Sequence, residues 1–228
     1  NLMVGVTMTE TAILIPARYD STRFPGKPLC KLGGMTMIEL VYARCATAGL
    51  DTYVLTDDER IGTLFNPDNV IYSDQEFANG TERCAYAAGM LPYDQFVNVQ
   101  GDMPDVTLDM IERTVWHLQN YSITTMFAKM TPELQNDPNS VKMVRAGDKA
   151  LWFGRGMTGY GDHHLGIYGY RANALDHYET LDITTEETVE QLEQLRWLKA
   201  GYDVGCLYTE FDGIEINSPT DAEKWNDR

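Results

Sequence analysis

A loop rich in basic and small residues follows the first strongly apolar segment of the chain. Residues 11–17 predict a buried strand, and Arg18, Arg23 and Lys27 come soon after it. In open α/β sheets, ligands bind beyond the carboxyl ends of the strands, where backbone N–H groups and cations can hold a polyphosphate. This spacing favours a nucleotide site; the alternative is a solvated basic turn. The loop is not a P-loop, since Pro28 follows the lysine where that motif has Ser or Thr.

An acidic residue follows a second strand pattern. Residues 96–100 predict a buried strand, and Gly101 and Asp102 come directly after it. Mg²⁺ takes one or two carboxylates together with phosphate oxygens, so an aspartate at this strand end could hold the metal on a triphosphate. The alternative is a turn aspartate that caps its own loop.

The elements that must position these residues alternate in the first half of the chain. Strand patterns are found at 11–17, 53–56, 70–72 and 96–100, and helix patterns at 37–48, 58–65, 81–90 and 107–118. This alternation predicts a right-handed βαβ sheet. After residue 120 the rhythm changes, with strand patterns at 122–129, 141–145, 150–153, 165–170 and 203–209. One helix is expected over 185–200, and a last helix begins at Ser218 and Pro219.

Composition and charge exclude several classes of protein. The chain has 228 residues and a formal net charge of −16, a surface that repels nucleic acid and anionic membranes. Its four cysteines form no C-x-x-C pair, which argues against a zinc site and indicates reduced thiols in a cytoplasmic protein. No apolar run approaches the length of a membrane span. We expect one domain over 1–228, with residues 1–10 as a flexible extension.

Seven collinear motifs span nearly the whole chain and occupy residues 15–29, 56–58, 80–83, 98–102, 141–142, 164–171 and 192–196. The first motif, IPARYDSTRFPGKPL, and the segment HLGIYGYR at 164–171 are the most specific. Together these motifs resemble one family, the 3-deoxy-manno-octulosonate (Kdo) cytidylyltransferases, or CMP-Kdo synthetases.

The resemblance implies a fold and a reaction. The fold is α/β and resembles the nucleotide-diphospho-sugar transferases: a Rossmann-like, mostly parallel sheet with helices on both faces. A mixed-sheet extension at about 122–185 covers the cleft and joins two chains in a homodimer. The reaction is Mg²⁺-dependent transfer of CMP from CTP to the anomeric hydroxyl of a 2-keto sugar acid, with release of pyrophosphate, in cytoplasmic lipopolysaccharide biosynthesis.

The resemblance also implies roles for individual residues. The catalytic residues are Arg18, Lys27 and Asp102. Residues that bind the nucleotide are Ala17, Arg18, Ser21, Lys27, Gly80 and Arg83. Residues that bind the sugar acid are Arg23, Gln100, His164, Tyr168, Glu193 and Gln194. The Mg²⁺ ligands are Asp102 and Asn217.

Without the resemblance, several of these residues have simpler interpretations. His164 would be a hydrogen-bonded core histidine, His163 a solvated one, and Glu193 part of the exposed face of an acidic helix. Two positions depart from the family pattern: Met103 replaces an acid, and Asn217 replaces an aspartate that helps to hold Mg²⁺. They leave open a different acceptor, such as an acylneuraminate or an amino-Kdo, and a nucleotide-binding homologue with impaired catalysis.

Overall fold

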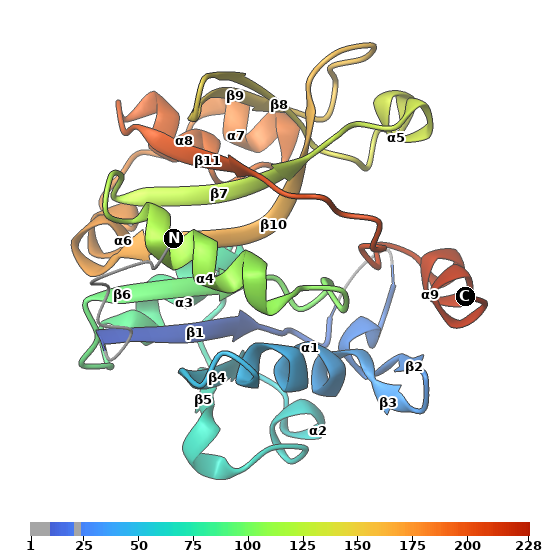
Figure 1. The fold of residues 1–228 in the computed structure, drawn as a ribbon. Coiled ribbons are helices and arrows are strands. Elements are labelled where there is room, and N and C mark those ends of the chain that lie inside the picture. The colour runs from blue at the N-terminus through green and yellow to red at the C-terminus, as the bar shows by residue number, and fades with distance from the viewer. Residues whose placement is uncertain (1–9, 21–23) are drawn as a thin grey trace, which may run out of the picture.

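The computed structural model describes residues 10–20 and 24–228, so residues 1–9 of the expected extension lie outside it. In the described chain, nine strands form one sheet in the order β5-β4-β1-β6-β10-β7-β11-β9-β8 (Figure 1). These strands are β1 (Thr11–Pro16), β4 (Asp51–Thr56), β5 (Val70–Tyr72), β6 (Gln95–Val99), β7 (Ile123–Ala128), β8 (Lys142–Ala146), β9 (Lys149–Gly154), β10 (Asp162–Arg171) and β11 (Val204–Tyr208). A separate hairpin joins β2 (Lys31–Leu32) to β3 (Met35–Thr36).

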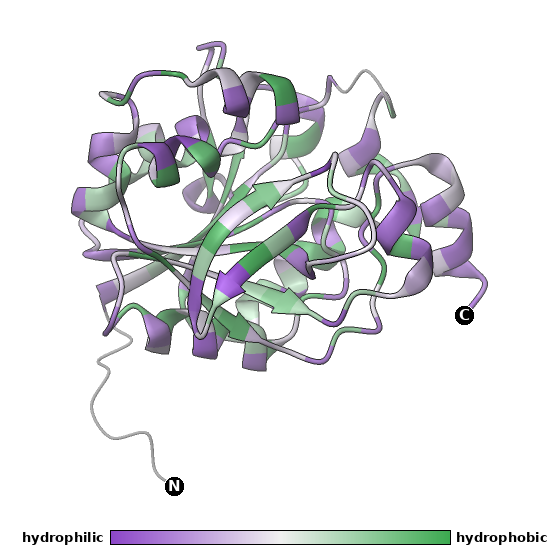
Figure 2. Cartoon of the chain, turned by 90° about the horizontal axis from the view of Figure 1, so that it is seen from above, coloured by the Kyte–Doolittle hydropathy of each residue, from purple (hydrophilic) through white to green (hydrophobic). Residues whose placement is uncertain are grey.

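The first half of the sheet is parallel and buried on both faces. Strands β5, β4, β1 and β6 run in the same direction. Leu14 of β1 packs in one apolar cluster, and its neighbours Ile13 and Ile15 pack in another on the opposite face. All three side chains are fully buried, as the continuous apolar run predicts. Figure 2 shows the hydrophobic residues concentrated along the central strands.

Helices cover both faces of this sheet, which confirms the predicted fold class. α1 (Met37–Ala46) and α4 (Leu108–His117) pack on the face of Ile13, whereas α3 (Gly80–Ala88), α6 (Ala172–Tyr178) and α8 (Leu195–Lys199) pack on the face of Leu14. Local sequence sets where the helices begin. The side chains of Thr36 and Thr107 cap α1 and α4 by accepting a backbone N–H from the first turn.

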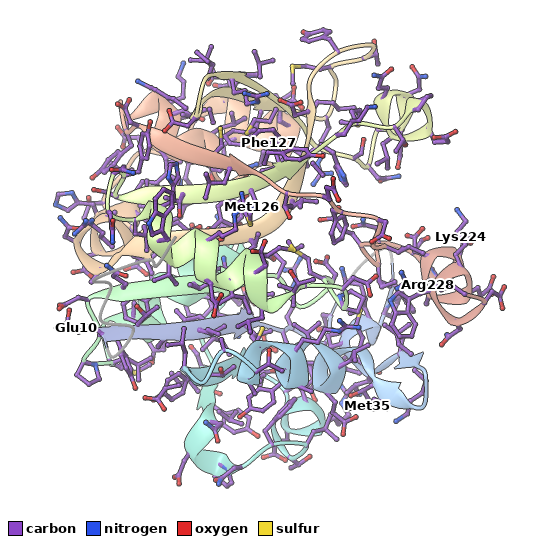
Figure 3. All side chains as sticks on the ribbon, viewed as in Figure 1. Glu10, Met35, Met126, Phe127, Lys224 and Arg228 are labelled. Carbon is purple, nitrogen blue, oxygen red and sulfur yellow. The ribbon has the colours of Figure 1, made fainter. Side chains whose placement is uncertain are left out.

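The second half of the sheet is mixed and closes on itself. β10 runs antiparallel to both β6 and β7, and β11 lies parallel to β7. A further pairing of β10 with β8 joins β10, β7, β11, β9 and β8 into a ring. Met126 and Phe127, labelled on β7 in Figure 3, pack on opposite faces. The dimer contact expected for residues 122–185, like the single-domain extent, stays a prediction.

The helix predicted over 185–200 is wrong, because the chain breaks within it. α7 (Thr185–Glu190) ends at Gln191, which adopts a left-handed conformation with φ of 55°, and α8 begins again at Leu195. Contacts of Arg196 stabilise the break, one within the segment and one with α3. Arg196 donates hydrogen bonds to Glu187 at 2.6 and 2.9 Å and to Glu82 of α3 at 3.1 Å. Residues 192–194 are therefore a turn that faces the sheet, not a solvated helix face.

Other local features also differ from the predictions or go beyond them. His163, expected in solvent, is buried, and its Nε2 lies 3.3 Å from a carboxylate oxygen of Glu215. The sequence patterns missed α5 (Pro132–Asn136) and α6. The remaining elements are α2 (Glu59–Gly62), α9 (Pro219–Asn226) and the 3-10 turns at Lys27–Leu29 and Pro67–Asn69. Within the described residues, no helix is long and apolar enough to cross a membrane.

Candidate active site

The loops after β1 and β6 emerge at the same edge of the sheet. The two strands are parallel neighbours, with Leu14 paired to Asn98, so their carboxyl ends point the same way. The backbone comes close there, because a Cβ at Gly101 would lie 3.0 Å from the carbonyl oxygen of Pro16. The loop carrying Lys27 and the one carrying Asp102 therefore meet, as the positions of the two strand patterns predict.

A first cavity lies against the loop that follows β1. Five of the six residues predicted to bind the nucleotide line it, and the sixth, Ser21, lies outside the described residues. The lining consists of Pro16, Ala17, Arg18, Lys27, Pro28, Met37, Phe77, Asn79, Gly80, Arg83, Gln100, Gly101 and Asp102. Three cations in one cavity give an otherwise acidic protein a local site for phosphate groups.

Arg83 is the most enclosed of these cations. It lies on α3 with only 6% of its surface exposed, and its Nη2 donates a hydrogen bond to Asp57 at 2.7 Å. Its Nη1 is buried without a hydrogen-bond partner among the described residues. A buried guanidinium donor is costly to leave unpaired.

Lys27 and Asp102 form an ion pair at the centre of the site. The Nζ of Lys27 lies 2.6 Å from a carboxylate oxygen of Asp102, and their side chains are 19% and 25% exposed. The residue predicted to bind phosphate thus neutralises the residue predicted to bind metal. When a phosphate and a metal cation enter together, Lys27 can pair with the phosphate and Asp102 with the cation.

A second cavity adjoins the first and shares two lining residues with it, Gln100 and Asp102. Five of the six residues predicted to bind the sugar acid line it, and the sixth, Arg23, lies outside the described residues. The lining consists of Gln100, Asp102, Asn139, Val141, Arg155, His164, Gly166, Tyr168, Gln191, Leu192, Glu193, Gln194, Glu215 and Asn217. We call it the acceptor cavity.

Glu193 reaches the acceptor cavity from the turn that breaks the predicted helix. Its carboxylate accepts hydrogen bonds from the backbone N–H of Gly80 at 3.1 Å and from the Thr81 hydroxyl at 2.7 Å, at the first turn of α3. Burial raises the pKa of Glu193, and these two hydrogen bonds oppose the rise. The side chain thereby joins the acceptor cavity to the helix that carries Arg83.

His164 and Tyr168 lie on one face of β10, as their spacing predicts, and an irregularity of the strand between Leu165 and Tyr168 brings their rings together. Their ring centroids are 5.3 Å apart, and Nε2 of His164 lies 3.0 Å from the hydroxyl oxygen of Thr125. Burial lowers the pKa of His164 to about 3, so the ring is neutral at physiological pH. His164 is thus both a hydrogen-bonded core residue and a lining residue of the cavity.

The neutral burial of His164 predicts a loss of stability in acid. Above pH 6.5 the residue is neutral in both states and contributes no pH dependence. Below that pH only the unfolded state takes up the proton, so stability falls as the pH drops from 6.5 towards 3. We expect a loss of roughly 2 kcal/mol between pH 7 and pH 5. Urea unfolding of the protein and of His164→Asn at both pH values measures it. Equal losses of stability in the native protein and in His164→Asn would contradict a lowered pKa of His164 in the folded state.

Two candidate metal ligands face the same cavity. The backbone N–H of Ile216 donates to the carbonyl oxygen of Asp102 at 3.0 Å, which brings Asn217 next to Asp102. Among the described residues, no group of three or more His, Cys, Asp or Glu side chains could hold a metal ion. One carboxylate and one amide oxygen are hard donors that suit Mg²⁺, which draws most of its other ligands from water and phosphate.

Glu215 is a cavity residue that sequence reasoning missed. Its carboxylate accepts the backbone N–H of Gly166 at 3.3 Å and approaches His163, as described above. Arg155, which also lines the cavity, comes from the glycine-rich segment 154–161. The glycine-rich composition of this segment was the sequence feature that could have pointed to Arg155. None existed for Glu215, because its place depends on the contact of residues 214–217 with the loop after β6.

The sheet, the cation-bearing loop and the carboxylate beside it define an α/β nucleotidyltransferase. The chain belongs to the cytidylyltransferase family, whose family model matches residues 12–204. The resemblance in its motifs is therefore confirmed.

Relatives and solved structures agree with this assignment. The 8-amino-3,8-dideoxy-manno-octulosonate cytidylyltransferase of Shewanella halifaxensis is 38% identical over 93% of this chain and 95% of its own. The 3-deoxy-manno-octulosonate cytidylyltransferase of Rickettsia africae is 36% identical over 94% and 93%. The structure of CMP:2-keto-3-deoxy-manno-octonic acid synthetase complexed with CTP matches with a TM-score of 0.86 and 30% identity, over 96% of this chain and 97% of that one. The inositol-1-phosphate CTP transferase from T. maritima, with a TM-score of 0.71 and 12% identity over 96% and 94%, shares the fold.

Proposed function

We propose that this enzyme transfers CMP from CTP to the anomeric hydroxyl of a 2-keto sugar acid, with Kdo as the leading acceptor. The observation that carries the proposal is the pair of adjoining cavities that share Gln100 and Asp102. One cavity presents cations for a triphosphate, and the other presents Arg155 together with uncharged and acidic hydrogen-bonding groups for a polyhydroxylated sugar acid. The names of the two relatives and the CTP complex support both substrates.

The reaction forms one bond and breaks one at the α-phosphorus. The anomeric oxygen bonds to phosphorus as the bond to the pyrophosphate oxygen breaks, and the proton of the hydroxyl passes to water. In this proposal Arg18 and Lys27 stabilise the charge on the departing pyrophosphate, and Arg83 helps to hold the nucleotide. Gln100, Tyr168 and Gln194 orient the acceptor. Positioning and electrostatic stabilisation suffice for such a transfer, so no covalent nucleophile is needed.

We propose Mg²⁺ as the cofactor, held by the Asp102 carboxylate and the Asn217 amide oxygen. Bound there, the ion would polarise the α-phosphate and lower the pKa of the attacking hydroxyl. Lys27 contacts one oxygen of the Asp102 carboxylate, and a bound triphosphate would give it a second anionic partner. Asn217 adds an oxygen but no charge, which leaves Asp102 as the principal ligand.

A second candidate acceptor carries an amino group, as in 8-amino-3,8-dideoxy-manno-octulosonate. Two carboxylates besides Asp102, those of Glu193 and Glu215, line the acceptor cavity. An ammonium group on the acceptor would lessen the repulsion that these acids exert on its carboxylate. The name of the Shewanella halifaxensis relative points to the same acceptor.

Glu215→Gln should shift the acceptor preference from the 8-amino sugar acid to Kdo. Glutamine keeps an oxygen for the Gly166 N–H and removes one charge from the cavity wall. We expect the ratio of kcat/KM for the amino acceptor to kcat/KM for Kdo to fall about two- to fivefold, the size of one charge interaction near a protein surface. Glu59→Gln, which removes the same charge from an exposed residue of α2, is the control. An unchanged ratio would show that Glu215 does not read the amino group.

A single assay tests the proposed reaction. Pyrophosphate release is measured with CTP and Mg²⁺ in the presence of Kdo, the 8-amino analogue or an acylneuraminate. We expect release that depends on the acceptor, with Kdo or its amino analogue preferred. CTP binding without release for any acid would instead identify a nucleotide-binding homologue. Release with ATP or GTP as readily as with CTP would contradict the nucleotide assignment.

We further propose that the enzyme works in the cytoplasm as a homodimer formed through residues 122–185. The four cysteines are free thiols, which agrees with a reducing compartment. Leu151, Tyr160 and Ile183, all within this region, are exposed by 49%, 57% and 63% and offer apolar surface for a second chain. Light scattering of the purified protein tests the dimer.

A further inference from the structure

Strand β10 bulges where it borders the acceptor cavity. Its register against β7 shifts between Leu165 and Tyr168, so Gly166 and Ile167 have no paired residues on β7. Thr125 of β7 lies opposite this bulge and is 1% exposed. Its hydroxyl fills the gap in the ladder by bonding to side-chain and backbone groups of β10.

The hydroxyl of Thr125 has one proton and two close partners. It lies 2.8 Å from the carbonyl oxygen of Ile167 and 3.0 Å from Nε2 of His164. A carbonyl oxygen can only accept, so the Thr125 proton goes to Ile167. The contact with His164 is then a hydrogen bond only if Nε2 carries a proton and donates it. This arrangement makes both contacts favourable at once.

The other ring nitrogen of His164 is left as an acceptor. No hydrogen bond joins Nδ1 to a described residue, and the ring lines the acceptor cavity. Edge-on contact with Phe153 and packing against Tyr168 hold the ring, with centroids 4.9 and 5.3 Å away. A neutral ring with Nε2 protonated carries a lone pair on Nδ1.

We propose that Thr125 is a positioning residue that fixes His164 as the Nε2–H tautomer, so that Nδ1 accepts a hydrogen bond from a hydroxyl group of the sugar acid. The identity of the ligand in this inference rests on the proposed function, whereas the tautomer of His164 does not. An Nδ1 lone pair accepts from hydroxyl groups and repels a carboxylate. The acceptor therefore binds with a hydroxyl, not its carboxylate, towards His164. The lowered pKa described above agrees with a ring that stays neutral in this role.

The tautomer can be observed in the free protein. Two-bond ¹H–¹⁵N correlation spectra distinguish a protonated ring nitrogen from one with a lone pair. We expect His164 to show protonated Nε2 and unprotonated Nδ1 at pH 7, and its Nδ1 resonance to move when Kdo is added. A protonated Nδ1 in the free protein would overturn the proposal.

Matched threonine variants test the consequence for the acceptor. Thr125→Val removes the hydroxyl and should raise the KM for Kdo about tenfold, the loss of one hydrogen bond, with the KM for CTP unchanged. Thr125→Ser should restore the Kdo value and the His164 spectrum. Thr124→Val is the control, because Thr124 is an equally buried neighbour whose hydroxyl bonds to Thr114 and not to the cavity. An unchanged KM for Kdo in Thr125→Val would overturn the role of Thr125.

Failure of this inference is distinguishable from failure of the proposed function. If the native protein transfers CMP to no sugar acid, the proposed function fails, while the tautomer is still read from the spectrum of the free protein. Titration with Kdo then decides the remaining step. A shift of the Nδ1 resonance supports acceptance of a hydroxyl, and a resonance that stays in place overturns it.

Discussion

Replacing Asp102 with asparagine should lower kcat for CMP transfer by about a hundred- to a thousandfold, the usual effect of removing a preorganised charge at the reacting centre. Asp102 lies where the two cavities meet, and it is the only carboxylate that lines both of them among the described residues. Asn217 adds no charge beside it. Pyrophosphate release against Mg²⁺ concentration measures the effect.

Two variants sharpen this test. Asp109→Asn removes an exposed aspartate on α4 and should leave the rate unchanged. Asn217→Asp adds a second carboxylate next to Asp102 and should lower the Mg²⁺ concentration needed for the half-maximal rate. Full activity of Asp102→Asn would remove the metal assignment. An unchanged Mg²⁺ curve for Asn217→Asp would mean that residue 217 takes no part in the site.

Lys27→Met should reduce kcat/KM for CTP by about a hundredfold, because it removes a cation from the phosphate side of the site. The same change frees Asp102 from the ion pair seen at 2.6 Å. The Mg²⁺ concentration for the half-maximal rate should therefore stay the same or fall, although the rate itself drops. A lower rate without a higher Mg²⁺ requirement distinguishes a loss of phosphate binding from a general loss of structure.

The control for Lys27 is close by in the chain. Lys31 is exposed on β2, and Lys31→Met makes the same change in charge. It should leave both the CTP titration and the Mg²⁺ curve as they are. Unaltered CTP kinetics in Lys27→Met would show that the loop after β1 does not bind the triphosphate.

The parallel half of the fold was predictable because its signals are local. The continuous apolar run in β1 and the threonine caps of α1 and α4 each lie within a few residues of the feature they determine. The position of Lys27 and Asp102 follows from the same logic, since both lie in the loops that follow neighbouring parallel strands. The motifs that resemble the cytidylyltransferases then supplied the acceptor residues.

The break between α7 and α8 was not predictable, because the sequence there favours a helix throughout. Arg196 and Glu193 stabilise the turn through contacts with Glu82 and Gly80, more than a hundred residues earlier. Glu215 depends in the same way on a distant backbone, that of Gly166. Contacts of this kind arise from the tertiary fold and leave no local pattern.

If the two cavities form one reaction centre, the oxygen of a sugar acid attacks the α-phosphorus of CTP. Kdo labelled with ¹⁸O at its anomeric hydroxyl tests this directly, because ³¹P spectroscopy detects which phosphorus carries the label. We expect ¹⁸O in the bond that links the sugar to the phosphorus of CMP, and none in the pyrophosphate released. Label in the pyrophosphate, or a labelled sugar that is never joined to phosphorus, would contradict attack of the sugar-acid oxygen on the α-phosphorus.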